Sequence, residues 1–98
     1  MLTPQRVIKI TKALADPTRF RILQRIANAR ESCCGELARD FPITQATVSQ
    51  HLKVLTDAGL IEPRRAGQFN YYRMRRDVFD AYQRTLATAL AGAPALRS

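Results

Sequence analysis

Apolar residues recur at helical spacing near the start of the chain. Val7, Ile10 and Leu14 lie three or four positions apart, as they would on one face of an α-helix. Thr3 precedes them as a candidate N-cap, and Pro4 stands at the first helical position, where its missing N–H costs nothing. The pattern therefore predicts a first helix that begins at Pro4.

The combination of a capping residue and a proline recurs at Asp16 and Pro17. An apolar stripe follows, and it predicts a second helix from Pro17 to about Asn28. The members of this stripe are Phe20, Leu23, Ile26 and Ala27.

Two further helices are predicted on either side of Pro42. The shorter one covers residues 33–41 with Ser32 as its N-cap, and it ends there because a proline disfavours helical conformation at the residue before it. The longer one covers residues 45–58 with Thr44 as its N-cap. A tight turn is thus expected between two consecutive helices.

The last third of the chain predicts a β-hairpin and a final helix. Extended runs at residues 60–65 and 70–74 are joined by a glycine-containing turn at residues 66–69. Residues 76–90 form the final helix, and residues 92–98 are expected to be disordered. One face of the final helix carries Val78, Tyr82, Leu86 and Ala89.

The expected fold class is mainly α with a small β-hairpin, in the order α-α-α-α-β-β-α. This order is that of a winged helix-turn-helix, and we expect a single domain over residues 1–98. A domain of this size buries only about two thirds of the surface of its unfolded chain. A second copy would help to complete the core, so a homodimer is expected.

Charge narrows the choice of partners. Sixteen Lys and Arg residues against eight Asp and Glu residues give a net charge of +8, a balance typical of proteins that bind nucleic acid or anionic membranes. No apolar run approaches the roughly 18 residues that a membrane-spanning helix requires, and the N-terminus does not resemble a signal peptide. We expect a cytoplasmic protein that binds DNA and no membrane.

The helix predicted over residues 45–58 has two contrasting sides. Val48, Leu52 and Leu55 cluster on one side as a core stripe. The other side carries short polar residues instead of the long Glu and Lys that a merely solvated helix prefers. Gln, Ser and Thr side chains hydrogen-bond to base edges or phosphates, and a helix fits the major groove. The candidate DNA contacts on this helix are Gln45, Ala46, Thr47, Ser49, Gln50 and Lys53.

The predicted hairpin supplies further candidate contacts. Arg64 and Arg65 come before its turn, and Gln68 and Asn70 come within or after it. Such side chains suit a wing that grips phosphates or enters the minor groove. The helix predicted over residues 45–58 follows a tight turn and precedes a basic wing. These neighbours favour DNA binding by this helix over the alternative of a polar surface helix without a partner.

Enzymatic activity is not expected. The sequence has no glycine-rich phosphate loop and no nucleophile paired with a base. His51 is the only histidine, and without partners at ligand spacing it is interpreted as a packing residue. We therefore predict no catalytic residue and no certain metal ligand.

Three segments together resemble one family. These are "KALADPTRFRILQRI" in the second helix, "CGELARDFPITQATVSQHLKVLTDAGLI" through the helix-turn-helix and "RRAGQFNYYRM" in the wing. The sequence over about residues 10 to 76 is similar to the ArsR (ArsR/SmtB) family of bacterial transcriptional repressors. The resemblance implies a homodimer that binds a partly palindromic operator and leaves it when an effector binds.

The resemblance also implies roles for particular residues. The dimer would be joined mainly through the first and last helices, whose apolar stripes are Val7, Ile10 and Leu14 together with Val78, Tyr82, Leu86 and Ala89. The implied groove-facing residues are Gln45, Ala46, Thr47, Ser49 and Gln50, with Arg64, Arg65 and Gln68 on the wing. These sets agree with the residues already singled out from the pattern.

Arsenic- and cadmium-sensing members of the family carry a Glu-Leu-Cys-Val-Cys-Asp-Leu box in the third helix. The matching run here is "ESCCGEL", in which Cys33 falls on the first cysteine of the box and Gly35 replaces the second. Cys34 lies between them. Zinc and nickel sensors use His and acidic ligands on the last helix, and this chain has no histidine there.

Three interpretations of Cys33 and Cys34 stay open. They could be packing residues, ligands of a soft metalloid ion such as arsenite or antimonite, or redox-sensing thiols. Two thiols per chain fall short of a three-sulfur site unless a ligand comes from elsewhere. The predicted function is a dimeric, effector-released repressor, and thiol sensing of a metalloid or an oxidant at this pair is one of the open interpretations. The alternative is a DNA-binding regulator or architectural factor without sensing of its own.

Overall fold

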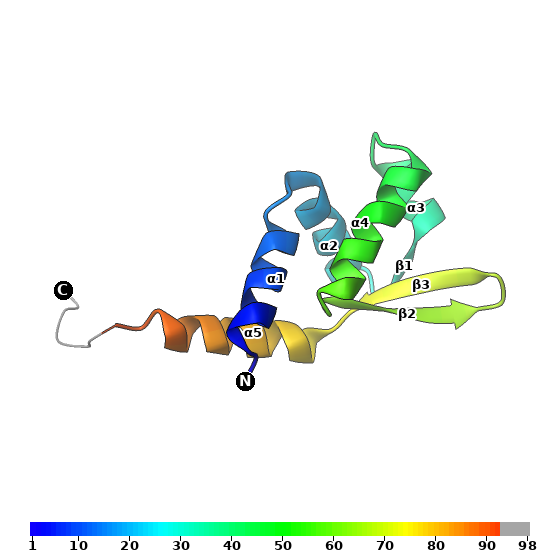
Figure 1. The fold of residues 1–98 in the computed structure, drawn as a ribbon. Coiled ribbons are helices and arrows are strands. Elements are labelled where there is room, and N and C mark those ends of the chain that lie inside the picture. The colour runs from blue at the N-terminus through cyan, green and yellow to red at the C-terminus, as the bar shows by residue number, and fades with distance from the viewer. Residues whose placement is uncertain (93–98) are drawn as a thin grey trace.

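The computed structural model describes residues 1–92, which form five helices and a three-stranded antiparallel sheet (Figure 1). The helices are α1 (Pro4–Leu14), α2 (Pro17–Asn28), α3 (Cys34–Asp40), α4 (Gln45–Asp57) and α5 (Arg76–Ala89). The strands are β1 (Ser32–Cys33), β2 (Ile61–Ala66) and β3 (Phe69–Met74). The predicted winged helix-turn-helix is confirmed, with one strand more than expected. Within the described residues, no helix has the length and apolar character needed to cross a membrane.

Three of the predicted helix caps are present. The Thr3 side chain accepts a hydrogen bond from the backbone N–H of Arg6, and Asp16 accepts one from Arg19. Thr44 caps α4 in the same way. Each such bond satisfies a backbone donor that the helix itself leaves unpaired, which stabilises the helix by about 1 kcal/mol.

The predicted cap of α3 is wrong by one residue. Ser32 is not an N-cap, because Ser32 and Cys33 form β1 and pair with Tyr72 and Tyr71 of β3. The N-cap of α3 is Cys33, and Ser32 is 2% exposed beside the sheet. A two-residue strand is too short to show alternation of polar and apolar residues, so the sequence pattern did not reveal it.

The turn of the hairpin is shorter than predicted. β2 and β3 pair up to Ala66 and Phe69, which leaves Gly67 and Gln68 as a two-residue turn. Gly67 has a φ of +60°, a backbone conformation that residues with a Cβ atom rarely adopt. The wing therefore projects as a regular ladder, as Figure 1 shows at the tip of β2 and β3.

The core lies between the helices and the base of the wing. The stripe of α4 predicted to face inward, Val48, Leu52 and Leu55, is buried. The other buried apolar residues come mainly from α1, α2 and the end of α4: Val7, Ile10, Ala13, Ile22, Leu23, Ile26, Leu37, Ala58, Leu60, Ile61 and Tyr82. α4 is thus fixed to the rest of the domain by its inner side.

Part of the predicted dimer interface belongs instead to this core. Val7, Ile10 and Tyr82 are 8%, 0% and 7% exposed within the single chain, so their side chains are already covered. The Tyr82 hydroxyl also lies 2.8 Å from the Thr11 hydroxyl, in a hydrogen bond that ties α5 to α1. Helical periodicity identified these positions as buried, and within the single chain other residues of the same chain already cover them.

The remaining predicted interface residues are less covered. Leu14, Val78 and Leu86 are half-buried, and Ala89 is exposed near the end of α5. Figure 1 shows α5 crossing α1 and continuing beyond it. The disorder predicted for residues 92–98 concerns a segment that, apart from Gly92, lies outside the described residues.

Because only one side of α4 is buried, substitutions on its two sides should change the free energy of unfolding by very different amounts. Leu52→Ala should lower the free energy of unfolding by about 2–5 kcal/mol, because it removes a fully buried side chain from the core. Gln50→Ala, on the exposed side of the same helix, should change it by less than about 0.5 kcal/mol. Urea unfolding followed by circular dichroism measures both values, and equal losses would contradict this placement of α4.

Candidate nucleic-acid interface

The turn between α3 and α4 orients the recognition helix. α3 ends where the Phe41 N–H donates to the Leu37 carbonyl, and the Ile43 N–H donates back to the Phe41 carbonyl at 2.8 Å. α4 then begins after its cap Thr44. Because these bonds close the turn within three residues, α3 and α4 are held as a compact helix-turn-helix.

The outward side of α4 is polar and accessible. All six candidate contacts predicted on this helix are exposed: Gln45, Ala46, Thr47, Ser49, Gln50 and Lys53. The structure therefore brings these residues together on one surface. Lys53 also contacts Asp57 one turn further along, at 3.3 Å, but both side chains are at least half exposed and such pairs are weak.

His51 contacts a neighbouring helix instead of solvent alone. Its Nδ1 lies 3.3 Å from the Arg19 guanidinium, which also donates to the carbonyls of Lys12 and Ala13 at the end of α1. A guanidinium has no acceptor, so Nδ1 must be the unprotonated nitrogen in this contact. This contact of His51 joins α4 to the corner between α1 and α2.

The wing arginines differ in how they are held. Arg64 donates two hydrogen bonds to the Glu31 carboxylate, at 2.5 and 3.0 Å, and its guanidinium carbon lies 5.4 Å from the centre of the Tyr71 ring. Among the described residues 1–92, Arg65 makes one bond, from its Nε to the Gly67 carbonyl at 2.9 Å, and its terminal N–H groups have no partner there. Arg64 is thus paired with a carboxylate, whereas no carboxylate in the described part of the chain pairs with Arg65.

Glu31 and Tyr71 were missed by the sequence analysis. β1 and β2 pair with opposite edges of β3, and Arg64 and Cys33 both stand opposite Tyr71 in their ladders. Glu31 directly precedes β1, so it meets Arg64 across the width of the sheet. The Arg64 guanidinium lowers the pKa of the Glu31 carboxyl below its usual value. No local pattern signals a pair formed in this way.

The two cysteines have different surroundings. Cys33 caps α3, and the Glu36 carboxylate accepts a hydrogen bond from the Cys33 N–H at 2.9 Å. This bond lowers the pKa of Glu36. The sulfur of Cys34 instead lies 3.4 Å from the Ser49 hydroxyl and 3.7 Å from the Gln45 carbonyl oxygen, both on α4.

A hollow of about 300 Å³ opens beside these thiols. It lies between the start of α3, the start of α4 and the wing. Its lining residues are Cys33, Cys34, Gly35, Gln45, Ser49, Gln68, Phe69, Asn70 and Tyr72. Gln68 and Asn70, the two polar residues predicted on the wing, therefore face the same space as Gln45 and Ser49 of the recognition helix.

The residues present do not form a complete metalloid site. Within residues 1–92, no three His, Cys, Asp or Glu side chains gather as they would around a metal ion. Arsenite or antimonite at Cys33 and Cys34 would lack a third sulfur ligand from this chain, which has only these two cysteines. The predicted metalloid ligand set is therefore incomplete here.

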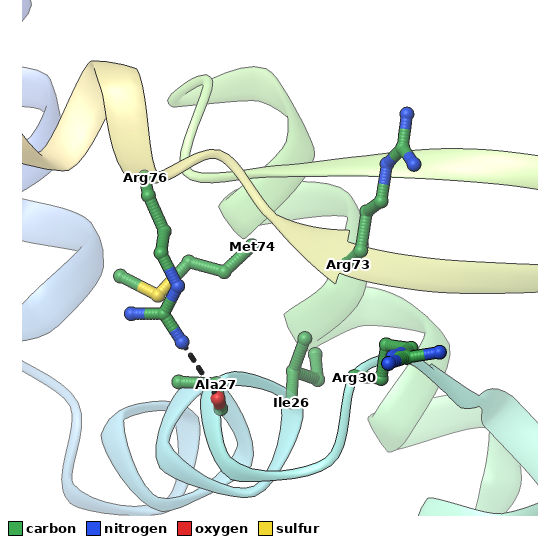
Figure 2. A pocket seen from close by; sticks show the side chains of 6 residues that line it. All are labelled: Ile26, Ala27, Arg30, Arg73, Met74 and Arg76. Carbon is green, nitrogen blue, oxygen red and sulfur yellow. Dashed lines mark hydrogen bonds between the residues drawn. The ribbon is translucent and has the colours of Figure 1, made fainter.

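A second hollow, of about 420 Å³, is lined by three arginines but does not form an anion site. It lies between the end of α2 and the start of α5 (Figure 2). Arg76 donates to the Ala27 carbonyl at 2.8 Å, whereas Arg73 points away from it and pairs with Glu62. Figure 2 shows that Arg30 points in a third direction. The arginines do not converge on one ligand.

Comparison with known proteins agrees with this geometry. The family model described as "Helix-turn-helix domain" matches residues 14–64. The arsenic resistance transcriptional regulator ArsR1 of Pseudomonas putida is 41% identical over 80% of this chain, and the match spans 59% of its own length. This chain thus corresponds to less than two thirds of that relative.

Solved structures show the same fold. An ArsR-like transcriptional regulator from Rhodococcus superimposes with a TM-score of 0.82 at 28% identity, over 89% of this chain and 81% of its own. The homodimeric winged helix-turn-helix DNA-binding domain Mb0332 of Mycobacterium bovis gives a TM-score of 0.72 at 31% identity, over 87% of this chain and 79% of its own. With its helix-turn-helix, its basic wing and these likenesses, the chain belongs to the ArsR family of winged helix-turn-helix transcriptional regulators.

Proposed function

We propose that this protein is a dimeric repressor that binds a specific DNA operator and leaves it in response to an effector. The observation that carries the proposal is the exposed, short-chained polar side of α4 next to a basic wing. The net charge of +8 supports attraction to the phosphate backbone. A repressor has to reach the chromosome, so we propose that the protein is cytoplasmic, as expected for a bacterial DNA-binding protein.

The two parts of the surface have different tasks in this proposal. α4 enters the major groove, where Gln45, Ser49 and Gln50 reach base edges through their amide and hydroxyl groups. The wing contacts the phosphates or the minor groove through Arg65, with Gln68 and Asn70 beside it. Arg64 joins these contacts only when it is released from Glu31.

The proposed dimer uses apolar residues that the single chain leaves open. Ile8 on α1 is 53% exposed and Leu90 after α5 is 75% exposed, and both stand near the predicted interface residues of these helices. Leu86 and Ala89 of α5 also remain available for contact. Because a two-fold dimer presents two identical recognition helices, its operator is expected to be partly palindromic.

Selection from a random DNA duplex library tests the function directly. The full chain should enrich a partly palindromic sequence, and fluorescence anisotropy at several salt concentrations should show tighter binding to it than to scrambled DNA. Specific binders typically favour their site by at least about a thousandfold. Sequence-blind binding with a similar salt dependence would contradict the proposal and favour an architectural DNA-binding protein.

Gln50→Ala should weaken binding to the selected operator by about tenfold to a hundredfold, since each bidentate base contact contributes roughly 1–3 kcal/mol of discrimination. Its binding to scrambled DNA should stay nearly unchanged. Gln83→Ala, an exposed glutamine on α5, is the matched control and should affect neither. Anisotropy titrations measure all three proteins, and equal losses on both DNAs would exclude base recognition by Gln50.

Arg65→Ala should weaken binding to every DNA sequence. Its free N–H groups suit a phosphate contact, so the slope of log affinity against log salt should fall by about one. Arg84→Ala removes the same charge from the exposed side of α5 and should leave the slope nearly unchanged. An unchanged slope for Arg65→Ala would remove this residue from the phosphate contacts.

Glu31→Gln should have the opposite effect, because it releases Arg64 to bind phosphate. The salt slope should steepen by about one. Glu62→Gln changes the net charge equally but releases only Arg73, since Arg75 stays paired with Asp77, so it serves as the control. The same steepening in both variants would show that net charge alone matters.

The ion pair also makes a pH prediction. The pKa of Glu31 is lower in the folded protein than in the unfolded chain, so the pair is intact above the usual carboxyl pKa and is lost only as the pH falls through the lowered value. The difference in salt slope between wild type and Glu31→Gln should therefore persist from pH 7 to about pH 5. Its loss in that range would contradict the assigned pair.

A further inference from the structure

The Cys34 thiol lies at the DNA-facing side of the domain, between α3 and the recognition helix. Its sulfur lies near two weak hydrogen-bonding partners in α4, the Ser49 hydroxyl and the Gln45 carbonyl, and the side chain packs partly against the core and is partly exposed. Cys33, by contrast, is occupied in capping α3 with Glu36, and its backbone lies in the β1 ladder. Of the two thiols, Cys34 can therefore change its partners at lower cost to the fold.

The hollow beside Cys34 has the size and lining of a small-molecule site. Its volume of about 300 Å³ is at the lower end of ligand pockets. None of its nine lining residues carries a formal charge, and four of them offer carboxamide or aliphatic hydroxyl groups: Gln45, Ser49, Gln68 and Asn70. Phe69, 53% exposed, and Tyr72 add aromatic surface. Amide and hydroxyl groups around a small aromatic surface suit a peptide-like occupant.

The same four polar residues are the predicted DNA contacts that meet in this hollow. Gln45 and Ser49 come from the recognition helix, and Gln68 and Asn70 come from the wing. An occupant of the hollow would hydrogen-bond to these groups and stand where DNA has to approach them. Occupation of the hollow and operator binding are therefore mutually exclusive.

We propose that Cys34 is a covalent modification site, at which a mixed disulfide with a peptide-like low-molecular-weight thiol blocks DNA binding. The inference rests on the proposed function of this surface. The co-reactant is a low-molecular-weight disulfide. The Cys34 thiol loses its proton to water, and its sulfur attacks one sulfur of that disulfide. A bond forms between Cys34 and that sulfur, the original S–S bond breaks, and the other half leaves as a thiolate, so that Cys34 is oxidised and the disulfide is reduced.

Glutathione disulfide is the probe for this reaction on the full chain. Wild type and Cys33→Ser should each gain one glutathione by intact-protein mass spectrometry, with peptide mapping to Cys34. Both should then lose at least about tenfold in affinity for the selected operator, and dithiothreitol should restore it. Cys34→Ser should gain no glutathione and keep its affinity. Serine is a good N-cap, so Cys33→Ser should keep the fold, which circular dichroism verifies.

A smaller reagent tests whether filling the hollow is what matters. Methyl methanethiosulfonate attaches only a methylthio group to the same sulfur, and the operator affinity should then change by no more than about twofold. A loss as large as that caused by glutathione would overturn the role of the hollow.

Three further outcomes would overturn the proposal: glutathione on Cys33 alone, no glutathione on either cysteine, or full operator affinity with Cys34 modified. Failure of the untreated protein to bind any DNA would instead contradict the proposed function. The mass spectra would still report the modification, so the two failures are distinguishable.

Discussion

The burial of one side of α4 is the constraint on which the rest of this surface depends. Val48, Leu52 and Leu55 are almost completely removed from solvent, and each such burial stabilises the fold by roughly 1.5–3 kcal/mol. Because a helix cannot rotate without withdrawing this stripe from the core, the opposite side is fixed toward solvent. The positions of Gln45, Ser49 and Gln50 on the outside therefore follow from the packing of their neighbours on the inside.

The short strand β1 is the second element that organises the site. It pairs with β3 through only two residues, yet it connects the start of α3 to the wing. Glu31, just before it, holds Arg64 across the sheet, and Cys33, at its end, caps α3. The position of β1 thus influences both the charge of the wing, through Glu31, and the start of α3, through Cys33. A change at β1 would therefore affect both of the elements that we propose contact DNA.

Local features of the fold were predictable, whereas long-range pairings were not. Thr3, Asp16 and Thr44 cap their helices as expected, since a cap involves residues only three positions apart. The pairing of Arg64 with Glu31 joins residues far apart in the sequence, so no window of sequence contains it. Val7, Ile10 and Tyr82 show a different limit: periodicity tells which face of a helix is buried but not whether its own chain or a partner covers it.

The same reasoning applies to the adjacent cysteines. As neighbours in sequence they suggest a chelating or redox-active pair, but they lie at a junction between strand and helix. Cys33 is the N-cap of α3, whereas the sulfur of Cys34 contacts Ser49 and Gln45 of α4. Joint action on one ion, or a disulfide between them, would require the Cys34 sulfur to leave its contacts with Ser49 and Gln45 of α4. The first turn of α3 is held by the bond from the Cys33 backbone N–H to Glu36. The proposed reaction at Cys34 alone does not require that backbone bond to break, and it takes place at the surface of α4 and the wing that we propose contacts DNA.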